Sequence, residues 1–162
     1  MARVDSQKPL LPSLLDRLID LDPDVSTEPA WSRSLTLREF ERSVLRDLEA
    51  LLNTRQIRSD LPDDLPESAQ SSLTYGLPDF SSAGVGYVDE RERLRKAVED
   101  VIHRFEPRIK QVRVMLHNPE NDFDRTLRMT IEGLLWVEPN PQPIAFDTVL
   151  QPSSGQCKVQ AK

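Results

Sequence analysis

The apolar residues of this chain change their spacing at one proline, Pro107. Before it, two segments repeat apolar residues every three or four positions, which is the period of an amphipathic helix. After it, three segments alternate apolar and polar residues, which is typical of strands with one buried face. A proline disfavours helical geometry in the residue before it, so Pro107 separates the two patterns. This order predicts an α+β domain, with amphipathic helices packed on a small antiparallel three-stranded meander.

Two long helices are expected before Pro107. The first runs over about residues 37–54, and Thr36 with Glu39 has the pattern of a capping box at its start. The second begins at Asp89, with Glu92 in the same pattern, and ends at the proline. A shorter helix is predicted over residues 13–20. The apolar faces of the long helices contain Phe40, Val44, Leu48 and Leu52, and Leu94, Val98, Val101, Ile102 and Phe105.

The strands are expected at residues 109–117, 125–137 and 144–150, joined by turn-rich segments. A three-stranded meander has two edges with unpaired backbone groups, and either edge can accept a strand from another chain. Residues 13–150 are predicted to form a single domain. Residues 1–12 and the polar residues 151–162 are predicted to be a flexible N-terminus and a flexible tail.

The charge of the chain limits its partners. The formal net charge is -6 and the pI is about 5.0, which argues against general binding to nucleic acid or to anionic membranes. No apolar run has the length of a membrane span, and the first residues lack the apolar stretch of a signal peptide. We therefore expect a cytoplasmic protein.

The residues that usually carry chemistry are few and scattered. His103, His117 and Cys157 fall in no ligand spacing, so neither a metal nor another cofactor is expected. Ser72 is not in a nucleophile elbow, and the pair Gly84 and Gly86 lacks the third glycine of a nucleotide loop. The sequence therefore favours a protein without enzymatic activity.

The segment Phe105-Glu106-Pro107-Arg108 permits two interpretations. From spacing alone, it is an ordinary helix stop with Glu106 and Arg108 in solvent. Alternatively, Pro107 fixes a rigid corner from which Glu106 and Arg108 reach a partner, since a guanidinium can fork onto a carboxylate or backbone carbonyls.

Three motifs in order resemble the TssE family, the small baseplate subunits of bacterial type VI secretion systems. They are Arg46-Asp47-Leu48 followed by Leu51-Leu52-Asn53-Thr54-Arg55, then Tyr75-Gly76-Leu77-Pro78-Asp79-Phe80, then Glu106-Pro107-Arg108. The last motif is shared with the lysozyme-like wedge proteins of contractile phage baseplates. Each motif alone is short, and the resemblance rests on all three over residues 13–150.

The resemblance implies a structural protein of the baseplate wedge, together with TssF, TssG and TssK. It also implies contact with the sheath of TssB and TssC, whose first ring is nucleated on the membrane-docked baseplate in the bacterial cytoplasm. We expect Glu106, Pro107 and Arg108, together with Arg113 and Arg128, to bind these partners. The meander is expected to face the sheath and to bind it by strand addition.

Two other functions remain open from the residues. One is a cryptic peptidoglycan-cleaving enzyme that uses Glu106 as acid, with Asp79, Asp89 or Glu132 as a second carboxylate. The other is a nucleic-acid adaptor using the basic cluster Arg91, Arg93, Arg95 and Lys96. The resemblance implies no catalysis, and the acidic net charge opposes the adaptor.

Overall fold

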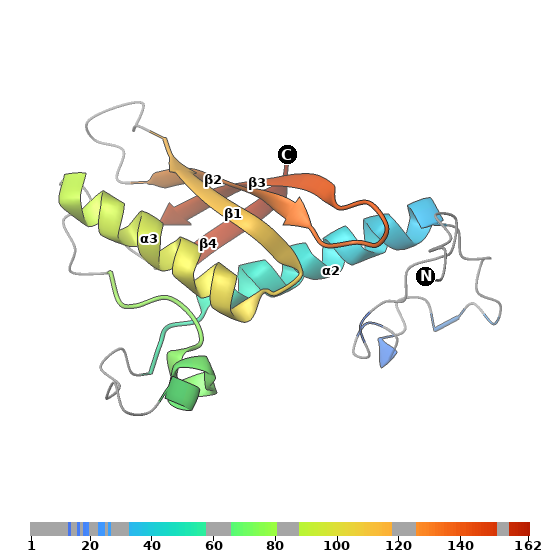
Figure 1. The fold of residues 1–162 in the computed structure, drawn as a ribbon, viewed down its shortest axis with the longest axis horizontal. Helices are drawn as coiled ribbons and strands as arrows, with labels where there is room; N and C mark the ends of the chain where they lie inside the picture. The colour runs from blue at the N-terminus through green and yellow to red at the C-terminus, as the bar shows by residue number, and fades with distance from the viewer. Residues whose placement is uncertain are drawn as a thin grey trace.

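The computed structural model describes residues 13, 16, 18–19, 23–24, 26, 33–57, 66–80, 88–117, 126–151 and 156–162. Two long helices precede an antiparallel sheet (Figure 1). The helices are α2 (Arg33–Asn53) and α3 (Val88–Phe105), with two short 3-10 turns, η1 (Pro66–Gln70) and η2 (Ser72–Thr74), between them. The strands are β1 (Ile109–Leu116), β2 (Leu127–Leu135), β3 (Gln142–Gln151) and β4 (Gln156–Ala161).

The sheet is a meander of four strands in the order β1-β2-β3-β4, so the expected α+β class is correct but the expected count of three strands was wrong. The fourth strand lies in the segment that was predicted to be a flexible tail. Its alternate residues Cys157 and Val159 are buried on the core face, and its backbone pairs with β3. Two apolar side chains in a polar segment give too weak a pattern to predict a strand from sequence. As a result β3, predicted as an edge, is an interior strand.

The helix boundaries differ from the prediction mainly at the start of α2. This helix begins at Arg33, so Thr36 lies inside it and the predicted capping box is not its start. No glycine or proline lies between Arg33 and Thr36 to prevent the extra turn. Helix α3 ends at Phe105, before Pro107, as predicted. Half of the residues in the helix predicted over residues 13–20 lie outside the described part of the chain; Asp16 and Leu18, which are described, are helical.

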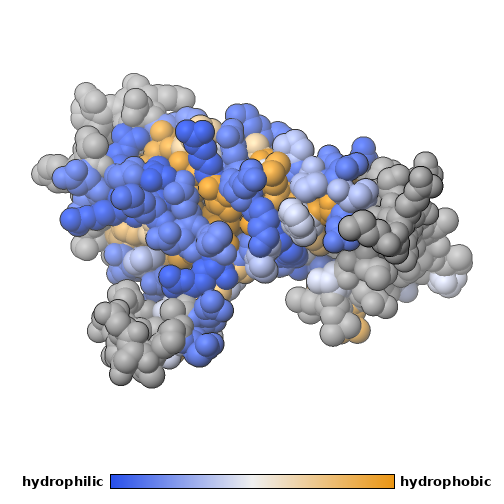
Figure 2. Space-filling model, viewed as in Figure 1, coloured by the Kyte–Doolittle hydropathy of each residue, from blue (hydrophilic) through white to orange (hydrophobic). Residues whose placement is uncertain are grey.

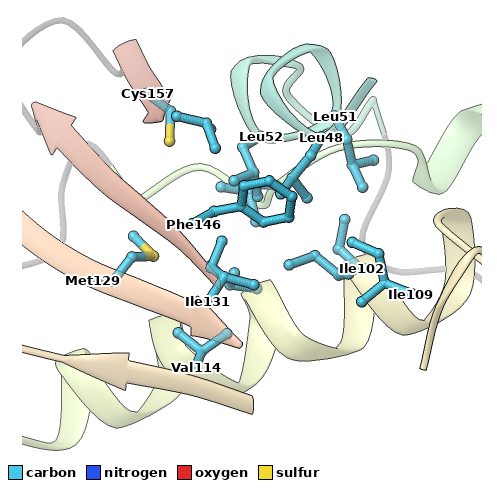
Figure 3. Close-up of a cluster of buried hydrophobic side chains, with 14 of the residues drawn as sticks. Leu48, Leu51, Leu52, Ile102, Ile109, Val114, Met129, Ile131, Phe146 and Cys157 are labelled. Atoms are coloured by element: carbon cyan, nitrogen blue, oxygen red, sulfur yellow. The ribbon is translucent and has the colours of Figure 1, made fainter. Parts of the chain in front are cut away.

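Both helices pack on one face of the sheet, with α3 against β1 and α2 against β4. Figure 3 shows the core between these layers, where side chains from both helices and all four strands meet. The buried residues labelled there are Leu48, Leu51, Leu52, Ile102, Ile109, Val114, Met129, Ile131, Phe146 and Cys157. Around this core the surface in Figure 2 is mostly hydrophilic. None of the helices in the described part of the chain is long and apolar enough to cross a membrane.

A β-bulge in β1 changes the predicted alternation of that strand. Its register shifts between Lys110 and Arg113, where Gln111 has a φ of 54°. Because the bulge adds a residue, Ile109 and Val114 both face the core although their separation in sequence is odd. Gly133 lies opposite, and a Cβ atom there would come within 2.5 Å of Ile109 Cγ2. This explains the glycine in β2.

Candidate interaction sites

The end of α3 turns sharply into the sheet. Glu106 N donates to Ile102 O at 2.8 Å and closes the last helical turn, and Ile109 N donates to Glu106 O at 3.1 Å. Glu106 is only 4% exposed, whereas Pro107 is exposed. The chain therefore turns so that the carboxylate faces inward and the proline faces solvent.

Arg108 holds the Glu106 carboxylate with a two-pronged interaction. Arg108 Nε donates to Glu106 Oε1 at 2.6 Å, and Nη2 donates to Oε2 at 2.5 Å. The same guanidinium reaches α2, where Nη2 donates to Asp47 Oδ2 at 2.6 Å and Nη1 to Ser43 Oγ at 3.2 Å. The hydrogen bonds that Arg108 donates to Glu106, joined by the one to Asp47, outweigh burial and raise the pKa of Arg108 above its ordinary value. Arg108 thus pairs within the chain and fixes the corner to α2.

A second arginine extends this network to the N-terminal segment. Arg46 donates to Asp47 Oδ1 and, at 2.9 Å, to Asp16 Oδ1. Ser43 Oγ donates to Asp16 Oδ2 at 2.7 Å, and Ser13 Oγ donates to the same oxygen at 2.5 Å. Burial opposes ionisation of Asp16, but hydrogen bonds from Ser13, Ser43 and Arg46 outweigh it and lower its pKa to about 2.

Aromatic rings support the corner from two sides. Arg108 Cζ lies 5.8 Å from the centre of the Phe40 ring, within the range of a cation–π contact. Tyr75 packs edge-on against Phe105, with ring centres 5.2 Å apart. Burial, followed by the nearby charges of Asp47 and Glu106, raises the pKa of Tyr75. The three sequence motifs therefore meet at one place, since Asp47, Tyr75 and Glu106 come from one motif each.

The segment that carries Tyr75 is attached to the end of α2 by backbone pairing. Leu77 N donates to Thr54 O at 2.8 Å, and Gln56 N donates to Leu77 O at 2.9 Å. Gly76 has a φ of +98°, and a Cβ atom there would come within 2.3 Å of Thr54 O, so this position requires glycine. Just before Tyr75, residues Ser72–Thr74 form a 3-10 turn.

The two edges of the sheet differ in how their backbone groups are used. At the β1 edge, Val114 N donates to Glu99 Oε1 at 2.9 Å, so a side chain of α3 occupies an outward N–H there. His117, just past the end of β1, pairs with Arg128 O through its N–H and accepts from Arg91 Nη2 at 2.7 Å through its carbonyl. At the β4 edge, Asn53 Nδ2 donates to Cys157 O and Cys157 N donates to Asn53 Oδ1, both at 2.8 Å. Asn53 thus pairs with one residue of β4 as a neighbouring strand would.

The outward groups of the rest of β4 follow from its register. Lys162 N donates to Ala145 O at 3.1 Å, so the even-numbered residues pair with β3 and the odd-numbered ones point away. In the described part of the chain no partner is recorded for the outward backbone groups of Val159 and Ala161. Beside them, a hollow of about 300 Å³ separates α2 from the ends of β3 and β4, lined by Arg38, Arg42, Leu45, Ala161 and other residues.

Arg113 and Arg128, the other two expected partner-binding residues, lie apart from the Glu106 corner. Both are exposed, on the face of the sheet opposite the helices. The structure therefore brings together Glu106, Pro107 and Arg108, and adds Ser43, Asp47 and Phe40, which the sequence did not single out as site residues. Only the resemblance, whose first motif contains Asp47, pointed to one of them.

The geometry does not favour the two other functions considered from sequence. Both oxygens of Glu106 are held by Arg108, so this carboxylate is not placed to protonate a polysaccharide. Asp79, one of the suggested second carboxylates, pairs with Arg55 at 3.2 Å. In the basic cluster of α3, Arg95 pairs with Glu92 and Glu99 and Arg91 binds the backbone of His117. Within the described residues, no three His, Cys, Asp or Glu side chains gather as a metal site requires.

Comparison with known proteins identifies the family of this chain. The family described as baseplate wedge protein gp25 matches residues 38–140, more than half of the chain. The chain belongs to the gp25 family of baseplate wedge proteins. This family is a structural component of baseplates, so the expected structural role in a baseplate is supported. A solved chain titled "The baseplate complex from the type VI secretion system" is similar at 21% identity and a TM-score of 0.49, over 70% of this chain and 96% of that chain. No curated protein matches the sequence.

Proposed function

We propose that this gp25-family chain is the TssE-type subunit of a type VI secretion baseplate. It joins the wedge proteins TssF, TssG and TssK to the TssB/TssC sheath and helps to nucleate sheath assembly, without catalysing a reaction. It acts in the bacterial cytoplasm, at the membrane-docked baseplate. The observation that supports the sheath-joining role is the difference between the two edges of its sheet.

The β4 edge is the one suited to strand addition. At the β1 edge, Glu99 occupies the outward N–H of Val114, which an added strand would need, and the bulge after Lys110 disturbs the hydrogen-bonding pattern of that edge. At the β4 edge, Val159 and Ala161 present outward N–H and C=O groups beside the hollow under α2. A strand from a sheath subunit can therefore extend the sheet next to β4.

The Glu106 corner is suited to the wedge side. The internal network leaves Pro107 exposed and Arg108 23% exposed. These two residues form a rigid surface, called the rim below, in which the arginine is already held in one orientation. A partner can use remaining donors of the guanidinium, which is already oriented by Glu106 and Asp47. Preorganised groups lose less conformational entropy on binding, which favours a permanent assembly contact.

An Ala161→Pro variant tests the edge assignment. It removes the outward N–H of Ala161 and leaves the Lys162–Ala145 hydrogen bond to β3 in place. We expect assembly of fluorescently labelled sheath in cells to fall at least tenfold, while co-purification with wedge proteins persists. Gln160→Pro is the control, because its N–H faces β3 and its loss should weaken the sheet itself. Normal sheath assembly with Ala161→Pro would refute strand addition at β4.

A further inference from the structure

We propose that the outer face of the sheet, opposite the helices, binds an acidic segment of another protein. The face consists of the outward residues of three cross-strand rows. They are Arg113, Glu132, Ala145 and Lys162; Met115, Thr130, Asp147 and Gln160; and His117, Arg128, Val149 and Lys158. Within the described residues, no helix covers this face.

The charge of the outer face is opposite to that of the chain. Lys110 lies outward beside the first row, and the face carries five basic and two acidic residues while the whole chain carries -6. The basic residues are Lys110, Arg113, Arg128, Lys158 and Lys162, and the acidic ones are Glu132 and Asp147. All seven are exposed. Helix α3, by contrast, has as many acidic as basic residues. The excess of positive charge is therefore local to the sheet.

One acidic side chain of the face is already engaged within the chain. Thr130, which is buried, donates to Asp147 Oδ1 at 2.9 Å, and its hydroxyl lies 2.7 Å from His117 Nε2. Because the Thr130 proton goes to Asp147, the histidine nitrogen is the donor of the second bond. These bonds orient Asp147 along the middle row of the face.

Arg128 and Lys158 make the most favourable place for an acidic residue. They flank Val149 on β2 and β4, about 10 Å apart by the spacing of alternate strands. That distance is close to the Debye length at physiological ionic strength, so their fields add over Val149. Val149 is 36% exposed, and Trp136, which is 56% exposed, follows the opposite end of β2 from Arg128. The face thus offers basic groups around apolar contacts, which a protein segment can cover.

A protein segment fits this face better than nucleic acid does. A duplex carries a negative charge about every 1.7 Å along its axis, and a phosphate backbone across the face would lie against Glu132 and Asp147. A peptide can place its carboxylates next to the arginines and lysines and keep neutral side chains over these two residues. Acidic residues of this chain, Glu120, Asp122 and Asp124 between β1 and β2, are the competing occupant that the experiment must distinguish.

The test places a photo-crosslinking amino acid at position 149 of the full chain in its native cell. We expect a crosslink to another protein, at a peptide with an excess of Asp and Glu, that falls at least tenfold in the Arg128→Glu, Lys158→Glu background. The matched control, Arg93→Glu with Arg104→Glu on α3, should leave the crosslink unchanged. Circular dichroism of both backgrounds establishes that they remain folded.

The other outcomes overturn the proposal. One is a crosslink to the wrong target: nucleic acid, residues 118–125 of the same chain, or a peptide without an excess of acidic residues. Another is that no crosslink forms, and the last is a crosslink that charge reversal does not reduce. The proposal does not depend on the assignment to a type VI baseplate. A crosslink to an acidic partner from outside a baseplate would support binding at the outer face and count against the proposed baseplate function. One proposal can therefore fail while the other stands.

Discussion

Arg108 and Asp47 lie 61 positions apart in sequence and form an ion pair at 2.6 Å that joins the start of the sheet to the middle of α2. Glu106 shares the same guanidinium but is buried, whereas the Asp47 side chain is 36% exposed. The two carboxylates therefore bind the same guanidinium from different surroundings, one buried and one partly exposed. Removing either charge should lower the stability of the fold by a different amount.

We expect Glu106→Gln to destabilise the fold by about 3 kcal/mol, because it leaves the half-buried Arg108 without its main counter-ion. Asp47→Asn should cost about 1 kcal/mol or less, since that side chain is more exposed and screened by solvent. Urea unfolding followed by circular dichroism measures both. Equal losses for the two variants would contradict the assignment of Glu106 as the principal partner.

Arg108→Lys tests whether the geometry of the guanidinium matters beyond its charge. A lysine cannot make the two parallel bonds to Glu106 while also reaching Asp47, so we expect a loss of about 1–2 kcal/mol in stability. Binding to purified wedge proteins should fall more than tenfold if the rim is the docking site. Exchange of Arg38 for lysine, on the exposed side of α2, is the matched control for both measurements.

Asp16 should make stability depend on pH in acid. Its pKa is lowered from 3.8 to about 2 in the folded chain, so its contribution is fully present above about pH 4 and is lost as the pH falls toward 2. The contribution amounts to about 2 kcal/mol. Unfolding measured between pH 5 and 2 should show a smaller decline in Asp16→Asn than in the unchanged chain. Parallel declines would mean that Asp16 does not hold the N-terminal segment to α2.

Gly76→Ala should destabilise the chain by about 2–4 kcal/mol, because the residue has a positive φ and the new Cβ would meet a backbone oxygen at 2.3 Å. Gly133→Ala meets the methyl end of Ile109 instead, so we expect a smaller loss. Thermal unfolding of the two variants gives the comparison. A harmless Gly76→Ala would show that the joint with Thr54 can move.

Cys157 should react slowly with thiol reagents as long as Asn53 covers this end of β4. Burial, with the nearby charge of Glu49, raises the pKa of the thiol to about 12, so little reactive thiolate exists near neutral pH. We expect slow reaction with a thiol reagent at pH 8 and a rate at least tenfold higher in Asn53→Ala, which removes both hydrogen bonds to the Cys157 backbone. Asn53→Asp keeps one acceptor and should fall between the two. Equal rates in all three chains would contradict a role for Asn53 in closing this end of β4.

The sequence predicted the elements whose signals are local. Phe105 and Pro107 end α3 as expected, because a proline acts on its immediate neighbours. Strand β4 was missed, since its burial of Cys157 and Val159 depends on pairing with β3. The partners of Arg108 could not be predicted either, because Ser43 and Asp47 come near it only when α2 and the sheet share one core. Long-range contacts of this kind leave no periodic pattern in the chain.

The unequal edges of the sheet also determine what copies of this chain can do to one another. A continuous sheet built from many copies requires each copy to offer two usable edges, and here Glu99 already occupies the outward N–H of Val114 in β1, beside the bulge after Lys110. Within the described residues, edge-to-edge pairing of two copies would use β4 of both, which leaves neither copy a second edge for a third. Edge pairing alone therefore does not join these chains into a continuous sheet, and β4 is the edge left for a strand of a different protein.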